Sequence, residues 1–168
     1  EDVTAHDDYA GLARVSAALD TPVAGGEYVY GSVPFRHMME ARSVDIPMID
    51  LMRSCGITGF MKIAAMAEAH YAQVAPHLYC GPIEGAANIQ FAACCPNFLI
   101  LESIERWEGF HAKILKKPVR WEDGYVIVPD EPGLGVELDE DVARAHPYTG
   151  TALHLNPVYG ELQEEHYP

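Results

Sequence analysis

The sequence predicts an α/β protein whose parallel strands belong to a barrel. Apolar strand-like runs alternate with helical patterns four times along the first 102 residues, which is typical of parallel strands joined by helices. A polar residue also follows each run at a nearly constant interval. One strand, one helix and two loops of an α/β barrel take about this many residues. These residues are Glu1, Glu27, Asp50, His77 and Glu102, spaced 26, 23, 27 and 25 residues apart.

The first two helix–strand pairs are predicted from a cap and from apolar spacing. Asp8 can accept a hydrogen bond from the first turn of a helix, whose apolar face begins at Leu12. The apolar run that opens at Pro22 predicts a short strand ending at Glu27. Residues 33–41 then predict a second helix, and VDIPMID at 44–50 predicts a second strand.

The next two pairs contain the clearest helix of the chain. Residues 57–71 place apolar side chains at helical spacing, and residues 73–78 predict a strand that carries His77 near its end. A further helix is predicted over 85–95, and FLILE at 98–102 predicts a buried strand. The apolar stripe of the clearest helix consists of Phe60, Ile63, Ala64, Ala67 and Tyr71.

The pattern changes after Glu102. Residues 119–129 predict a β-hairpin that turns at Glu122-Asp123-Gly124, and residues 139–145 predict a short helix. From His146 onward there is little periodicity. We therefore expect two parts: residues 1–118 form the repeating strand–helix part, and residues 119–168 form a hairpin, a helix and a tail that pack against it or against a capping domain.

The spacing of the five polar residues suggests a shared site. The carboxyl ends of parallel strands meet at one end of a barrel, where active sites are built, so these side chains are expected to converge there. A simpler interpretation exists for each residue alone, because an acid after a strand often caps the next helix or faces solvent. Five residues in step with the barrel period favour the site.

Composition limits the classes of partner and compartment. The net charge of −14 would repel phosphate backbones, so no nucleic acid partner is expected. No apolar run reaches the length of about 18 residues that a membrane helix needs, and no secretion-type segment opens the chain. The four cysteines form no CxxC pair and predict reduced, buried thiols, which favours a cytoplasmic protein.

Several motifs together resemble the enolase superfamily. GGE at 25–27, VDIPMID at 44–50, APHL at 75–78 and PNFLILE at 96–102 resemble its mandelate racemase subgroup, in the second half of the barrel domain. The resemblance extends over about residues 1 to 145. The segment from His146 is similar to the C-terminal segment of the acid-sugar dehydratases of this subgroup.

The resemblance implies a role for each of the five polar residues. Glu1 and Glu27 match carboxylates that bind one Mg²⁺ ion. His77 matches a general acid or base that also contacts substrate, and Asp50 matches the aspartate that pairs with it. Glu102 matches a glutamate that hydrogen-bonds the substrate or intermediate. The implied activity is Mg²⁺-dependent dehydration of a sugar acid, through an enediolate, to a 2-keto-3-deoxy acid.

The resemblance also implies that these residues belong to a longer enzyme. If Glu1 ends the fourth barrel strand, the N-terminal capping domain, the early strands, an aspartate ligand and a lysine base lie outside this sequence. The N-terminal half of the same enzyme is then a partner, and a homo-oligomer is expected. Three departures from the family pattern concern geometry, namely Asp2-Val3 after Glu1, Pro47 within a strand and Cys55 where glycine is usual. A mid-strand proline removes a ladder hydrogen bond, so we expect a local adjustment at Pro47.

Three other interpretations stay open at this level. A racemase, epimerase or cycloisomerase would form the same intermediate and convert it to a different product. A non-catalytic barrel relative would keep the fold and lack part of the site. A doubly wound nucleotide-binding domain is disfavoured, because no GxGxxG loop follows a strand.

Overall fold

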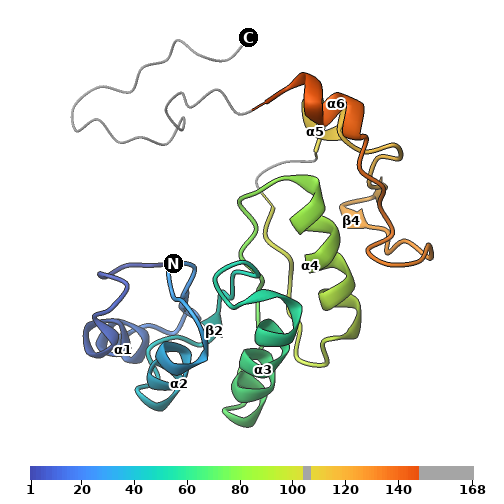
Figure 1. Cartoon of the computed structure of the whole chain (residues 1–168). Helices are drawn as coiled ribbons and strands as arrows, with labels where there is room; N and C mark the ends of the chain where they lie inside the picture. Colours follow the sequence, from blue (N-terminus) through green and yellow to red (C-terminus); the bar gives the residue numbers. More distant parts are fainter. Residues whose placement is uncertain (104–106, 148–168) are drawn as a thin grey trace.

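The computed structural model describes residues 1–103 and 107–147, in which helices alternate with extended segments in chain order (Figure 1). The α/β fold predicted from the sequence is confirmed. The elements of the alternating part are α1 (Tyr9–Ala18), β1 (Ala24–Gly25), α2 (Ser32–Glu40), β2 (Ile46–Pro47), α3 (Gly56–Ala69) and α4 (Pro82–Cys94).

The extended segments pair in parallel and in the order of the chain. Strand β1 pairs with β2 so that Ala24 lies opposite Ile46. Single parallel bridges continue the pairing from Asp50 to His77 and from Val74 to Phe98. The segments predicted as strands over 73–78 and 98–102 are therefore extended, with isolated bridges in place of a continuous ladder.

Two buried prolines explain why the ladder is interrupted. The carbonyl oxygen of Pro47 accepts a hydrogen bond from the N–H of Ala75, and that of Pro76 accepts one from Glu102. Neither proline has an N–H of its own to donate, so each removes one bond that a continuous ladder would contain. The mid-strand adjustment expected at Pro47 is thus present.

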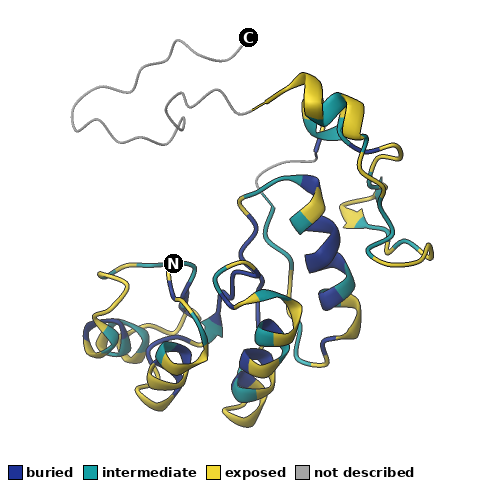
Figure 2. Ribbon diagram, viewed as in Figure 1, coloured by how far each residue is buried: buried dark blue, intermediate teal, exposed yellow. Residues whose placement is uncertain are grey.

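Helices α1 to α4 follow one another around the extended segments, and their buried faces point toward them (Figures 1 and 2). The centre of this core is aromatic: the ring centroids of Phe60 and Phe91 are 3.8 Å apart, and Phe35 is completely buried. No helix in the described part of the chain is both long and apolar enough to cross a bilayer.

Local sequence signals explain where the helices begin and end. The carboxylate of Asp8 accepts a hydrogen bond of 2.8 Å from the N–H of Gly11 and caps α1. Helix α4 begins three residues earlier than predicted, because Pro82 suits the first turn of a helix. Helix α3 ends at Ala69, so Tyr71 lies outside it and is 99% exposed. Its predicted place in the apolar stripe was wrong, whereas the other four residues of the stripe are buried.

Two predictions about burial were also wrong. Leu99 and Ile100, in the segment predicted as a buried strand, are 43% and 62% exposed. This segment lines a cavity that it shares with Trp121, Tyr125 and Val126 of the hairpin region, which cover its side chains only in part. Cys55 and Cys94 are exposed as well, because both lie at helix ends, although all four cysteines are free thiols as expected.

The region after Glu102 forms a smaller unit of short elements. It contains α5 (Phe110–Lys113), which was not predicted, and the predicted hairpin of β3 (Trp121–Glu122) and β4 (Tyr125–Val126). Asp123 and Gly124 both have positive φ angles, as a two-residue hairpin turn requires. Helix α6 (Glu140–Ala145) follows. The division at residue 118 stays a prediction, and the predicted tail from residue 148 lies outside the described residues.

A tryptophan connects this unit to α4. Trp107 is 3% exposed and packs with Leu78 and Ile89 in a second apolar cluster. Its indole N–H donates a hydrogen bond of 3.4 Å to the carbonyl of Cys80. A Cβ atom on Gly85 would lie 2.2 Å from the indole ring, so the ring fits only because residue 85 is glycine.

We therefore expect Gly85→Ala to destabilise the protein by about 1–3 kcal/mol, because the indole must move out of its site. Gly81→Ala is the matched control, since a Cβ atom there meets nothing within 4 Å. Urea unfolding of the two variants in the full-length protein measures the difference. Equal stability of the two variants would contradict this packing.

Candidate active site

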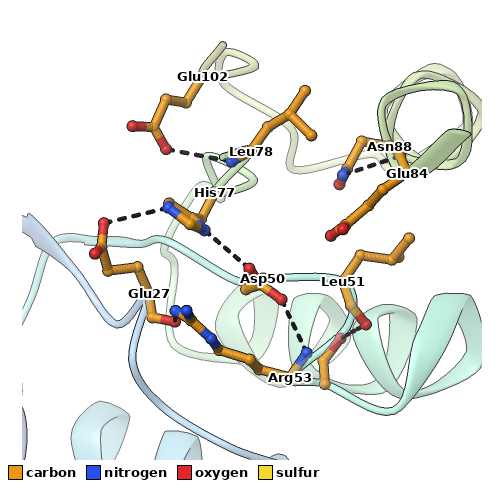
Figure 3. Close-up of polar contacts among 10 residues, drawn as sticks. Glu27, Asp50, Leu51, Arg53, His77, Leu78, Glu84, Asn88 and Glu102 are labelled. Carbon is orange, nitrogen blue, oxygen red and sulfur yellow. Dashed lines mark hydrogen bonds and ion pairs between the residues drawn. The ribbon is translucent and has the colours of Figure 1, made fainter. Parts of the chain in front are cut away.

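Four of the five polar residues converge where the extended segments end (Figure 3). Glu27 follows β1, Asp50 follows β2, and His77 and Glu102 lie at the ends of the next two segments. Helices α2 to α4 take up the chain between them, so residues about 25 positions apart reach the same place. The spacing in the sequence therefore corresponds to proximity in space.

His77 lies between two carboxylates. Its Nδ1 is 2.9 Å from Oδ2 of Asp50, and its Nε2 is 3.5 Å from Oε2 of Glu27. The imidazole side chain is 7% exposed, so both contacts are shielded from water. Asp50 and His77 also form a parallel backbone bridge, which brings their side chains to the same side of the sheet.

Asp50 is held as a carboxylate by its hydrogen bonds. Burial alone would raise its pKa, but the hydrogen bond to His77 and one of 2.9 Å from the N–H of Arg53 outweigh burial and lower it. The nearby Arg53 guanidinium lowers the pKa further. Because Asp50 is ionised, it accepts a hydrogen bond from the protonated Nδ1 of His77 and leaves Nε2 for other partners.

The pKa of His77 is raised above its ordinary value. Burial disfavours the charged imidazolium, but the hydrogen bond to Asp50 and the charges of Glu27 and Glu102 more than compensate. The imidazole therefore carries its second proton to a higher pH than a solvent-exposed histidine does. A group of this kind can deliver a proton near neutral pH.

Glu102 shows the opposite behaviour to Asp50. Burial raises its pKa, and the charges of Glu1 and Glu27 add to that effect. His77 and a hydrogen bond of 3.3 Å from the N–H of Leu78 act in the other direction without cancelling it. The Glu102 carboxyl thus keeps a proton to higher pH than usual and can donate a hydrogen bond in that form.

Glu1 lies at the exposed edge beside β1. The neighbouring residue Asp2 donates its N–H to the carbonyl of Ala24 at 3.4 Å and accepts from the N–H of Gly26 at 3.3 Å. Glu1 itself is exposed, and its charge acts on Glu102 across the site. The structure therefore places Glu1 at the same end of the sheet as the other four residues.

The donor set suits Mg²⁺ but is incomplete within the described residues. Mg²⁺ prefers carboxylate oxygens, and Glu1 and Glu27 offer them near Glu102, whose pKa is raised first by burial and further by the charges of these two residues. No group of three or more His, Cys, Asp or Glu residues in 1–103 or 107–147 is arranged to hold a metal ion. The described residues therefore do not form a complete metal site by themselves.

Sequence reasoning missed two residues of this region, Arg53 and Tyr28. The Arg53 guanidinium donates to the carbonyl oxygen of Glu27, and the Tyr28 hydroxyl donates to the Glu27 carboxylate, which raises the tyrosine pKa. One signal could have revealed Arg53. It is a basic residue three positions after Asp50, in a part of the chain where other candidate residues are acidic.

A family model described as enolase C-terminal domain-like matches residues 1–142. The chain belongs to the enolase superfamily. Within it, the relatives and structural neighbours place the chain in the mandelate racemase subgroup, among relatives of acid-sugar dehydratases, as the sequence motifs implied.

Curated relatives of this superfamily member include a dehydratase and a cycloisomerase. D-xylonate dehydratase of Haloferax volcanii is 36% identical over 83% of the chain and 34% of its own length. D-galactarolactone cycloisomerase of Agrobacterium fabrum is 34% identical over 77% of the chain and 36% of its own length. The chain therefore spans about a third of the length of the curated relatives it matches.

Solved structures show the same architecture. A mandelate racemase/muconate lactonizing enzyme from a Sulfitobacter species superposes with a TM-score of 0.83 at 45% identity, over 89% of this chain and 37% of that one. L-talarate dehydratase from Polaromonas sp. JS666, complexed with Mg and L-glucarate, superposes with a TM-score of 0.73 at 28% identity, over 85% and 37% of the two chains.

The shifted pKa values predict a pH-dependent contribution of the Asp50–His77 pair to stability. The raised pKa of His77 stabilises the fold below pH 6.5, and this contribution is lost as the pH rises through the folded-state pKa. The lowered pKa of Asp50 stabilises the fold above pH 3.8, and this contribution is lost as the pH falls through its folded-state pKa. The pair therefore stabilises most between these two values.

We expect Asp50→Asn to lower the free energy of unfolding by about 1–3 kcal/mol in this window, and by less at higher pH. Urea midpoints of the full-length protein between pH 4 and pH 9, with a chelator present, measure the difference. Glu40→Gln is the control, because Glu40 pairs with His37 on the exposed surface of α2. A difference that does not change with pH would contradict the assignment.

Proposed function

We propose that the full-length protein carrying this chain is a Mg²⁺-dependent dehydratase that converts a sugar acid to a 2-keto-3-deoxy acid. The observation that carries the proposal is the placement of His77 between Asp50 and Glu27, with Glu102 beside it. Dehydratases among the relatives support the same reaction class. The five residues belong, in this proposal, to the C-terminal half of a (β/α)8 barrel.

His77 acts on the leaving group in this proposal. Because Nδ1 is bound to Asp50, Nε2 is the nitrogen that can reach a substrate, and the raised pKa keeps a proton there. A base takes the proton from the carbon next to the substrate carboxylate, and the family resemblance implies a lysine outside this chain for that role. The β-hydroxyl then breaks its bond to carbon, takes the proton of His77 and leaves as water.

Glu102 and the two proposed metal ligands stabilise the negative charge that develops on the substrate during the reaction. Glu1 and Glu27 would hold Mg²⁺ through their carboxylates, and the bound ion would supply positive charge beside the substrate carboxylate. Glu102 orients the substrate by hydrogen bonding, and its raised pKa allows the protonated carboxyl to donate to an oxygen on which charge develops. After water has left, the enol product takes up a solvent proton and becomes the keto acid.

We expect the full-length protein to release keto acid from one or more members of a panel of sugar acids, only when Mg²⁺ is present. His77→Asn keeps an amide near Asp50 but cannot deliver the proton, so kcat should fall by about 100-fold or more. His37→Asn is the matched control, because His37 is an exposed histidine on α2. A continuous assay for the keto acid measures all three proteins.

Full activity of His77→Asn would remove this residue from the mechanism. Turnover that is unchanged by a chelator would contradict the metal requirement. Absence of turnover with every sugar acid and Mg²⁺ would contradict the dehydratase assignment itself.

A second candidate is a racemase, epimerase or cycloisomerase, which the cycloisomerase among the relatives supports. Reaction in deuterated water separates it from dehydration. We expect a keto acid that carries solvent deuterium at C3, because the enol left by water loss is protonated there. Substrate that exchanges its α-hydrogen without losing water would favour racemisation or epimerisation, as NMR and mass spectrometry of the recovered acids would show.

A further inference from the structure

Arg53 joins the two loops that carry Glu27 and Asp50. Its guanidinium Nη1 donates to the carbonyl oxygen of Glu27, and its N–H donates to Oδ1 of Asp50 at 2.9 Å. Its own carbonyl accepts from the N–H of Gly31 at 2.9 Å. Two of these hydrogen bonds connect the loop after β1 with the loop after β2, and the third holds the Asp50 carboxylate within the second loop. Figure 3 shows Arg53 between Glu27 and Asp50.

Two tyrosines fix the guanidinium from the other side. The Cζ atom of Arg53 lies 5.1 Å from the ring centroid of Tyr28 and 5.7 Å from that of Tyr30. A guanidinium is planar and can stack on aromatic rings while it donates in its own plane, whereas a lysine ammonium is a compact point charge without a plane that stacks. Arginine is therefore the residue type that this arrangement requires.

The contacts of Arg53 are with groups that position the site rather than with a substrate. Its backbone holds the carboxylate of Asp50, which in turn holds Nδ1 of His77. Its side chain holds the backbone of Glu27, whose carboxylate lies 3.5 Å from Nε2 of His77. A shift of either loop would thus change what surrounds the imidazole.

We propose that Arg53 is a positioning residue, which fixes the loop of Glu27 relative to the Asp50–His77 pair so that metal ligand and acid keep a common geometry. The proposal rests on the function proposed above for this site. Residues that orient ligands from outside a metal site commonly change affinity or activity by about 10- to 100-fold when replaced.

The test uses Arg53→Ala, Arg53→Lys and the control Arg36→Ala in the full-length protein. Arg36 is an exposed arginine that pairs with Glu40 on α2, so its loss removes a guanidinium away from the site. Two quantities are measured: Mg²⁺ affinity by calorimetry, and kcat and KM with a sugar acid that the wild type accepts. Thermal unfolding shows whether each variant is folded at the assay temperature.

We expect Arg53→Ala to lower kcat and Mg²⁺ affinity by about 10- to 100-fold, with a smaller change in KM. Added guanidinium ion should restore part of the activity of Arg53→Ala and should leave the activity of Arg36→Ala unchanged. Arg53→Lys should recover little, because it keeps the charge without the planar fork. If Arg53→Ala does not fold, Arg53→Lys and Tyr30→Leu, which removes one stacking ring, carry the same test.

Wild-type kcat and Mg²⁺ affinity in folded Arg53 variants would overturn the proposal. A loss of activity that occurs only at temperatures where the variant unfolds would also overturn it, because that result would show a role in stability alone. Failure of the dehydratase proposal would give a different result, because the wild type would then turn over no sugar acid. In that case the Mg²⁺ affinities of the wild type and the Arg53 variants would still show whether Arg53 positions Glu27.

Discussion

The arrangement of the site depends on the pairing of two neighbouring extended segments at Asp50 and His77. The same two residues form a backbone bridge and a side-chain hydrogen bond of 2.9 Å. Side chains alternate between the two faces of a sheet, so a slip of one residue would turn His77 to the opposite face. The register of the backbone therefore determines whether the imidazole meets its carboxylate at all.

Burial and charge give three chemically similar acids different behaviour. Asp50 is buried but receives two hydrogen bonds, and its pKa falls. Glu102 is half-buried, and this burial together with the charges of Glu1 and Glu27 raises its pKa. Glu27 is bound through its backbone by Arg53 and keeps its carboxylate oriented toward His77. The fold thus places a carboxyl of lowered pKa, a carboxyl of raised pKa and a candidate metal ligand around one imidazole.

Sequence reasoning reached the helices and the convergence of the site because both depend on periodicity, which the sequence displays directly. It overestimated strand length, since the effect of Pro47 and Pro76 depends on which neighbours each would have bonded. It missed the exposure of Leu99 and Ile100, because burial depends on which other parts of the chain pack against a side chain. Arg53 was missed for a related reason: the partners of its guanidinium are a backbone carbonyl and ring faces, so its position three residues after Asp50 was the only sign of it in the sequence.

The connection between residues 27–31 and 50–55 has a consequence for how this scaffold can diversify. Gly31 and Glu27 both bond to Arg53, so the two loops are structurally interdependent even though 22 positions separate Gly31 from Arg53. A segment transplanted from a homologue into one of them alone would meet a mismatched counterpart. New substrate preferences on this scaffold are therefore more accessible through joint exchange of both segments than through piecemeal recombination.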